Sequence, residues 1–242
     1  DALKESGIKQ NEINLFSATC GPGLIGGLLI GSTFTKSLSI GNSKPFIPIN
    51  HLEAHILSGF YNNEIKFPHL SLLITGGHTQ IYFLKNYNDI TLIGETIDDA
   101  IGEAFDKVAK ILGLSYPGGP EIEKKALQGN ESFFKLPKPL INDDSFNFSF
   151  SGLKTAVNLI AKKNIIDQNF IKDMSASFQK CVGDILSLKL KRVIAELYKN
   201  TTEDLSVSVV GGVANNDYLK KCFKKIEDKE VIRFVYPPKF MM

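Results

Sequence analysis

Residues 70–113 read "LSLLITGGHTQIYFLKNYNDITLIGETIDDAIGEAFDKVAKILG" and contain the clearest strand and helix patterns of the chain. Three short apolar runs, "LSLLITGG", "TQIYFLKN" and "ITLIGET", are joined by tight turns, a pattern that predicts consecutive antiparallel strands. The last part, "DDAIGEAFDKVAKILG" at 98–113, has apolar residues at helical spacing and predicts an amphipathic helix. A strand meander followed by a helix indicates an α/β unit.

Further helices and strands are expected after this stretch. A helix opens in "YPGGPEIEKKAL", and two more are expected at about 151–163 and 168–198. "LSVSVVGGVANNDYLKKCFKKI" predicts a strand, a glycine turn and a helix, and "VIRFVY" predicts a closing strand. The resulting order is β-β-β-α-β-α-β, which defines a second lobe at residues 65–242.

The preceding part of the chain shows only the end of such an order. We expect a strand at 13–20, a helix from Leu24 to about Ile40, a strand at 45–50 and a helix at about 51–62. Residues 1–64 are therefore predicted to form a partial first lobe.

The composition favours a soluble cytoplasmic protein. The 242 residues are 43% hydrophobic, without an apolar run that could span a bilayer and without a signal peptide in "DALKESGIKQ". The three cysteines, Cys20, Cys181 and Cys222, form no Cys-x-x-Cys pair, which argues against a disulfide framework or a cysteine-based zinc site. A net charge of +2 is too small to indicate nucleic-acid binding by itself.

Glycine clusters follow several of the apolar runs directly. Three of them, "CGPGLIGG", "ITGGHTQ" and "VVGGVANN", are joined by a fourth at "YPGGP". Glycine lets backbone amides approach a phosphate closely, and a following helix N-terminus adds positive potential. Together they favour a nucleotide cleft. None has the G-x-G-x-x-G setting of a dinucleotide fold, and the chain lacks G-x-x-x-x-G-K-[ST], so Rossmann dehydrogenases and P-loop enzymes are disfavoured.

The segment "NHLEAHI" places His51 and His55 four residues apart. On a helix the two imidazoles lie on one face and can bind one metal ion. A metallopeptidase of the H-E-x-x-H type needs a glutamate directly after the first histidine, where this chain has Leu52. Glu53 points roughly 200° around the helix from His51, so the protease interpretation fails on geometry.

Two histidines do not complete a metal site, because a catalytic metal usually has at least three protein ligands. Spacing does not select the third ligand among His69, His78 and the many carboxylates. Histidine together with carboxylate suits iron, zinc or manganese. The ion could activate a water or clamp phosphate or carboxylate oxygens.

These motifs together resemble one family. "GPGLIGGLLIG", "NHLEAHI", "LLITGGHTQI", "GETIDDAIGEAFDKVAKILGLSYPGGPEIE", "FSFSGLKTAV" and "GGVANNDYLK" resemble, in the same order, the bacterial tRNA N6-adenosine threonylcarbamoyltransferases, once described as sialoglycoprotein endopeptidases. The resemblance runs from about residue 10 to the end, and the block at 94–123 is its most specific part. It implies the actin-like/Hsp70-like ATPase (ribonuclease H-like) fold, in which two lobes close on a nucleotide cleft.

The resemblance also implies a transferase of t6A biosynthesis. The threonylcarbamoyl group would pass from threonylcarbamoyl-AMP to N6 of adenosine 37 in tRNAs that read codons starting with A. The implied cofactor is one divalent metal ion, Fe2+ foremost with Zn2+ or Mn2+ as alternatives, and threonylcarbamoyl-AMP or ATP would occupy the cleft. The implied partners are the tRNA, a paralogous actin-like subunit and a small ATPase subunit. No association with a membrane is expected.

Carried onto this chain, the family pattern assigns the metal to His51 and His55. Asp106 matches a carboxylate that contacts the ribose, and Asn216 matches a residue that reads the adenine or ribose. From the residues alone, Asp106 could be an exposed helix carboxylate, Asn216 a helix N-cap and His78 a turn residue. Residues 73–77, "LITGG", match the phosphate-side substrate loop. The full set of substrate-binding positions implied is Leu73, Ile74, Thr75, Gly76, Gly77, Asp106, Gly119, Glu123 (where many relatives have Asp) and Asn216.

The ends of the chain depart from the family pattern. The family's third metal ligand is an aspartate just beyond the stretch that matches "YPPKFMM", so it is expected beyond Met242. The opening strands of the first lobe are also missing, and the chain resembles an internal fragment that lacks both termini. Expressed alone, such a fragment is expected to be poorly stable and inactive.

Three other functions fit parts of the pattern. A small-molecule kinase of the same fold would share the glycine turns but has no use for H-x-x-x-H, and phosphoryl transfer to a small acceptor would identify it. A metallopeptidase is disfavoured by Leu52. A chaperone-like ATPase lobe that only binds partners would differ from the enzyme in metal uptake, which His51→Ala tests.

Overall fold

The computed structural model describes residues 2–23, 25–197, 205–228 and 232–241. The chain divides into two compact units, Asp1–Leu57 and Ser58–Met242, and each is described here by itself. Three expected boundaries, the helix start at Leu24, the helix end at 198 and the strand start at 231, lie outside the described residues.

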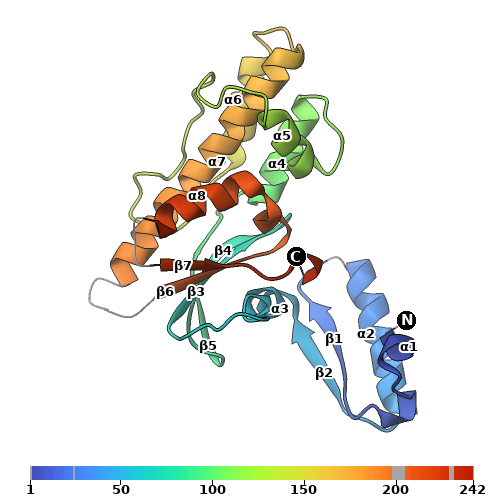
Figure 1. The fold of residues 1–242 in the computed structure, drawn as a ribbon. Helices are drawn as coiled ribbons and strands as arrows, with labels where there is room; N and C mark the ends of the chain where they lie inside the picture. The colour runs from blue at the N-terminus through green and yellow to red at the C-terminus, as the bar shows by residue number, and fades with distance from the viewer. Residues whose placement is uncertain (1, 24, 198–204, 229–231, 242) are drawn as a thin grey trace. The chain divides into compact units, whose positions relative to one another are not determined.

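The first unit is built around a β-α-β arrangement (Figure 1). Strands β1 (Phe16–Gly21) and β2 (Phe46–Asn50) pair in parallel, and α2 (Ile25–Gly41) connects them. A parallel pair needs such a crossover, so the strand, helix, strand order expected from the sequence is confirmed. The unit also contains α1 (Ala2–Ser6) and the short 3-10 helix η1 (Gln10–Glu12), and α3 (His51–Ser58) follows β2 directly.

A five-stranded sheet in the order β5-β4-β3-β6-β7 forms the second unit's framework. The first three strands make the predicted antiparallel meander, whereas β6 pairs in parallel with both β3 and β7. Their bounds are β3 His69–Ile74, β4 Thr79–Asn86, β5 Asp89–Glu95, β6 Leu205–Val210 and β7 Ile232–Val235.

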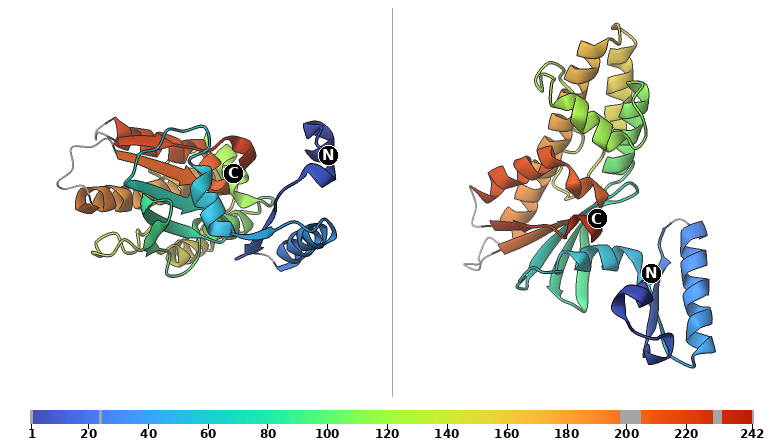
Figure 2. Two further views of the ribbon diagram at one scale, coloured as in Figure 1. Left: turned by 90° about the horizontal axis from the view of Figure 1, so that it is seen from below. Right: turned by 45° about the vertical axis from the view of Figure 1, so that its right-hand side comes forward.

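Five helices stack on one side of this sheet (Figure 2). Alternate strand residues such as Leu72 and Val207 join Phe105 and Phe178 in one apolar core, which burial of large side chains stabilises. Within the described ranges we find no helix with the length and apolar character that a membrane span requires. The helices are α4 (Ile101–Ile111), α5 (Gly118–Ala126), α6 (Ser151–Ala161), α7 (Gln168–Leu197) and α8 (Asp217–Glu227), with short 3-10 helices η2 (Gly212–Asn215) and η3 (Lys239–Met241).

The other face of the sheet carries a buried histidine. His69 on β3 lies 2.8 Å through Nδ1 from Ser206 Oγ and 3.0 Å through Nε2 from Ser208 Oγ, both on β6. The Ser208 backbone N–H also donates to Nε2, at 3.2 Å, which places the ring proton on Nδ1. Burial lowers the pKa of His69 from 6.5 to about 4. Both ring nitrogens are used within the sheet, so His69 has none left for a metal.

This histidine should make folding sensitive to acid. Below pH 6.5 the unfolded chain protonates His69, whereas the folded chain resists protonation until pH is near 4, so stability is lost as pH falls. We expect its contribution to the free energy of unfolding to fall by about 2 kcal/mol between pH 7 and pH 5. Urea unfolding of the wild type and His69→Gln at both pH values measures this. The same loss in both proteins would contradict the assignment.

Candidate functional site

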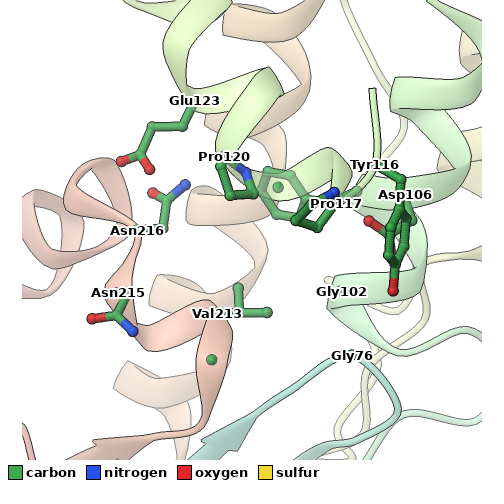
Figure 3. A pocket seen from close by; sticks show the side chains of 13 residues that line it. Gly76, Gly102, Asp106, Tyr116, Pro117, Pro120, Glu123, Val213, Asn215 and Asn216 are labelled. Atoms are coloured by element: carbon green, nitrogen blue, oxygen red, sulfur yellow. The ribbon is translucent and has the colours of Figure 1, made fainter. Parts of the chain in front are cut away.

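A pocket of about 330 Å³ lies at the carboxyl ends of β3 and β6, entirely within the second unit (Figure 3). The turn after β3 contributes Gly76, and the turn after β6 contributes Gly212 and Val213. Gly102 of α4 and Gly119 of α5 complete what we call the glycine-lined pocket. Ligands of open α/β sheets bind at this edge, outside the carboxyl ends of parallel strands.

Some of the glycines are required by the packing of the chain itself. A Cβ on Gly102 would lie 2.6 Å from the Gly76 Cα, and one on Gly118 would lie 2.8 Å from the Asp106 Cα. Gly211 has φ +94°, and a Cβ there would lie 2.5 Å from the Ile74 carbonyl oxygen. These positions let α4, α5 and the β6 turn approach their neighbours closely.

Other glycines face open space instead. A Cβ on Gly76, Gly119 or Gly212 would meet no atom within 4 Å, and all three line the pocket. None of them has a positive φ that demands glycine. Their lack of a side chain keeps the pocket empty, which is the arrangement expected where a ligand comes close to the backbone.

The predicted phosphate loop is a tight turn held by Thr75. The Thr75 N–H donates to the His78 carbonyl at 2.8 Å, and Thr75 Oγ1 accepts from the His78 N–H at 2.9 Å. Leu73 and Ile74 are fully buried residues of β3, and neither lines the pocket. Of the predicted positions 73–77, Gly76 lines the pocket.

Two predicted carboxylates line the pocket and also hold helix N-termini. Asp106 Oδ1 accepts from the Gly118 N–H at 2.7 Å, at the first residue of α5. Glu123 Oε1 accepts from the Asp217 N–H at 2.6 Å, at the first residue of α8. Each carboxylate has a second oxygen, and ionised carboxylates accept several hydrogen bonds, so each can bind a ligand as well.

Asn216 lines the pocket as predicted, but its amide is used by the protein. Its Oδ1 accepts from the Leu219 N–H at 2.9 Å, which makes it the N-cap of α8, and its Nδ2 donates to Gln179 Oε1 at 3.0 Å. The capping role that the sequence offered as an alternative is therefore present. A ligand could still use the second lone pair of Oδ1.

Eight residues that line the pocket are not among the predicted positions, and Asn215, Tyr116 and Val213 are three of them. Asn215 precedes the predicted Asn216, and its Oδ1 is buried without a hydrogen-bond partner among the described residues. Such an orphan acceptor costs free energy unless a ligand satisfies it. Tyr116 and Val213 also line the pocket. Both belong to quoted motifs, "YPGGP" and "GGVANN", but nothing in those letters shows which way their side chains point.

The "FSFSG" motif serves the fold rather than the pocket. Asp98 accepts from the Phe150 N–H at 2.8 Å and from the Ser149 and Ser151 hydroxyls at 2.5 and 2.8 Å. Partial burial would raise the pKa of Asp98, but these hydrogen bonds outweigh it and lower that pKa. The anchored segment starts α6 at Ser151.

The histidine pair lies in the first unit, on α3. Asn50 Oδ1 accepts from the Leu52 and Glu53 N–H groups at 2.9 and 3.2 Å, which starts the helix just before His51. The His51 and His55 ring centroids are 4.6 Å apart, so the predicted proximity is present. Across the described part of the chain, no group of three or more His, Cys, Asp or Glu side chains is arranged to hold a metal ion.

The family profile and similar curated proteins both identify the same protein family. The sequence profile of the tRNA N6-adenosine threonylcarbamoyltransferase family matches residues 1–241. The chain is 47% identical over 241 residues to the tRNA N6-adenosine threonylcarbamoyltransferase of Rickettsia rickettsii (strain Sheila Smith), covering 98% of this chain and 70% of that protein. The corresponding protein of Rickettsia bellii (strain OSU 85-389) is 47% identical over 240 residues, with the same coverage.

Among solved structures, HypF of T. kodakarensis superposes with a TM-score of 0.68 at 13% identity, over 97% of this chain and 39% of that one. Likeness at this identity shows the fold alone, and it agrees with the α/β actin-like ATPase fold expected from the sequence. The family assignment rests on the sequence match. The chain belongs to the tRNA N6-adenosine threonylcarbamoyltransferases, a family of tRNA-modifying transferases of t6A biosynthesis.

Proposed function

We propose that the glycine-lined pocket binds the adenylate from which this protein transfers a threonylcarbamoyl group to N6 of adenosine 37 of tRNA. The observation that carries the proposal is the set of glycines at 76, 119 and 212, which keep the pocket clear although the packing of the chain does not require them. Family membership supplies the donor, threonylcarbamoyl-AMP, and the acceptor, a tRNA that reads codons starting with A.

The pocket offers distinct contacts for each part of the adenylate. Gly76 in the turn after β3, with Leu73–Gly77 around it, suits the phosphate, because small residues let backbone amides approach. The free oxygen of Asp106 suits ribose hydroxyl donors, and Gly119 leaves space beside it. Asn215 and Asn216 lie with Glu123 at the other end of the pocket, where polar groups can meet the adenine (Figure 3).

In the reaction, the N6 amine attacks the carbonyl carbon of the mixed carbamoyl–phosphoric anhydride. A C–N bond forms, the C–O bond to the phosphate breaks, AMP leaves and the amine loses one proton. The donor therefore has to be held so that its carbonyl faces the acceptor, and water has to be kept away from the anhydride.

We also propose that His51 and His55 hold a divalent metal ion. Their rings lie close together on consecutive turns of α3, on the same face of the helix. Imidazole is a suitable ligand for Fe2+, the ion we favour, and also for Zn2+ or Mn2+. Two imidazoles are an incomplete set, so further ligands must come from other groups. Such an ion would supply positive charge to phosphate and carbonyl oxygens.

The partner assignments rest on the family alone. A paralogous actin-like subunit and a small ATPase subunit are part of the proposal, as is action in the cytoplasm, where tRNA is modified. We propose the two lobes at residues 1–64 and 65–242 as the parts of the chain that carry the metal helix and the nucleotide pocket, respectively.

The reaction itself is tested in the full-length protein, assayed together with the proposed partner subunits. Threonylcarbamoyl-AMP and unmodified tRNA are the substrates, and t6A is quantified by mass spectrometry. We expect Asp106→Asn to lower kcat/KM about tenfold through a weaker ribose contact. Asparagine keeps an oxygen for the Gly118 N–H, so the Tm should change little, whereas Asp106→Ala should lose stability as well. Full activity of Asp106→Asn would remove Asp106 from the site.

Gly119→Ala tests the role of the open glycines. A methyl group here meets no protein atom and sits at the second residue of α5, so the Tm should stay the same or rise. We expect AMP binding, measured by calorimetry, to weaken about tenfold or more because the methyl fills ligand space.

Gly152→Ala is the matched control for this variant. It sits at the second residue of α6, where its Cβ would meet only Pro139 at an ordinary 3.6 Å, outside the pocket. It should bind AMP like the wild type. Unchanged affinity in Gly119→Ala, or an equal loss in both variants, would place the nucleotide elsewhere.

Metal content after purification and dialysis, measured by mass spectrometry, tests the histidine pair. His51→Ala and His55→Ala should each lose most of the bound metal, because each removes one of two adjacent imidazoles. Glu53→Gln, an exposed change between them on the same helix, should retain it. Metal retained by both histidine variants would show that the ion binds elsewhere.

A further inference from the structure

We propose that Tyr116 forms the docking surface for the acceptor base, stacking on the unpaired adenine of adenosine 37 beside the glycine-lined pocket. This inference rests on the proposed function and adds a substrate-binding residue to it. Tyr116 lines the pocket although its side chain is 84% exposed, so the ring stands at the rim rather than inside.

The exposed ring lacks the support that other exposed aromatic side chains have. Tyr87, 60% exposed, packs on Phe60 and Phe67 at 5.4 and 4.9 Å between ring centroids, and Phe133, 61% exposed, packs on Phe134 at 4.8 Å. No ring contact to Tyr116 is found among the described residues. A large apolar ring left open at a binding pocket marks an interaction surface.

The size of the pocket argues that two adenines cannot share it. A volume of about 330 Å³ is at the lower limit for a small-molecule site and suits one nucleotide. When the adenylate fills it, the acceptor has to approach from outside, across the rim. Tyr116 is the exposed aromatic residue of that rim.

The position of Tyr116 separates it from the groups assigned to the adenylate's own base. In Figure 3, Tyr116 lies beside Asp106 on one side of the pocket, whereas Asn215, Asn216 and Glu123 lie on the other. With the ribose at Asp106 and the adenine toward the two asparagines, the ring of Tyr116 stays free next to the sugar–phosphate end. That end carries the group to be transferred.

The acceptor chemistry requires such a surface. An enzyme that modifies a base has to take it out of the stack, and exposed bases in RNA loops are commonly received on aromatic side chains. Stacking recognises the flat face of the adenine and leaves its N6 edge free to react.

Steady-state kinetics with wild type, Tyr116→Phe and Tyr116→Leu test the proposal. Tyr116→Leu should raise the KM for tRNA by about 5- to 100-fold, the range expected for one base–aromatic stack. Tyr116→Phe keeps the ring and should stay close to wild type. The affinity for AMP, measured by calorimetry, should be unchanged in both. Tyr87→Leu, an exposed tyrosine outside the pocket, is the control and should keep the wild-type KM.

A fluorescent tRNA gives a second measurement, because base fluorescence would not change if Tyr116 had only a structural role. With 2-aminopurine in place of adenosine 37, stacking on a ring should quench the base in complexes with wild type and Tyr116→Phe. Emission should be higher with Tyr116→Leu. Weaker AMP binding with an unchanged KM for tRNA would mean that the ring stacks on the adenylate, and this overturns the inference.

A wild-type KM in Tyr116→Leu, or an equal rise in Tyr87→Leu, also overturns it. These kinetic measurements use the full-length protein with its proposed partner subunits. Absence of t6A with that wild-type assembly is a separate outcome, which rejects the proposed function and the inference together.

Discussion

The parallel pairing of β3 with β6 is the interaction on which the rest of the second unit depends. It aligns Leu70 with Val207 and Leu73 with Val210, although about 137 residues separate the partners in the chain. Because both strands run the same way, their glycine turns end at the same edge of the sheet. The turns also touch: Gly211 lies so close to the Ile74 carbonyl that any larger residue would collide with it. The pocket is a consequence of this one register.

The residues that line the pocket also hold its walls in place. Asp106 binds the first N–H of α5, Glu123 binds the first N–H of α8, and Asn216 caps α8. Each bond contributes about 1 kcal/mol to stability, and together they fix the two helices relative to the glycine turns. Side chains held in this way are already oriented, which would lower the entropic cost of binding a ligand that contacts them. It also means that truncating these side chains damages the fold and the site at once.

Periodicity and turn residues predicted most of the fold. The meander at 70–96, the amphipathic helix at 98–113 and the strand before "GGVANN" are local patterns, and local patterns are legible in a sequence. Contacts between distant segments were not legible. Nothing near His69 shows that Ser206 and Ser208 bind its two nitrogens, so it stayed a metal candidate until the sheet register was known.

The same limit applies to the site. Gly76, Asp106, Gly119, Glu123 and Asn216 were placed in one pocket by family resemblance, and they do line one pocket. The exposure of Tyr116 and the orphan oxygen of Asn215 depend on how α5 and α8 sit against the sheet. No pattern in the sequence predicts the exposure of Tyr116 or the missing hydrogen-bond partner of Asn215.

The fold by itself does not determine what this pocket does. HypF and the component A of (R)-2-hydroxyglutaryl-CoA dehydratase from Acidaminococcus fermentans superpose on the chain with TM-scores of 0.68 and 0.50, at 13% and 14% identity. At this identity, what such proteins share with the chain is the fold alone. Specific chemistry must then come from side chains at the mouth of the pocket, where the second substrate arrives. In this chain the mouth presents the exposed ring of Tyr116, which makes no ring contact among the described residues, beside the carboxylate of Asp106. Such a ring suits the flat base that we propose as the acceptor. If the acceptor base docks there as proposed, the rim of the pocket selects the acceptor, which the fold alone does not do.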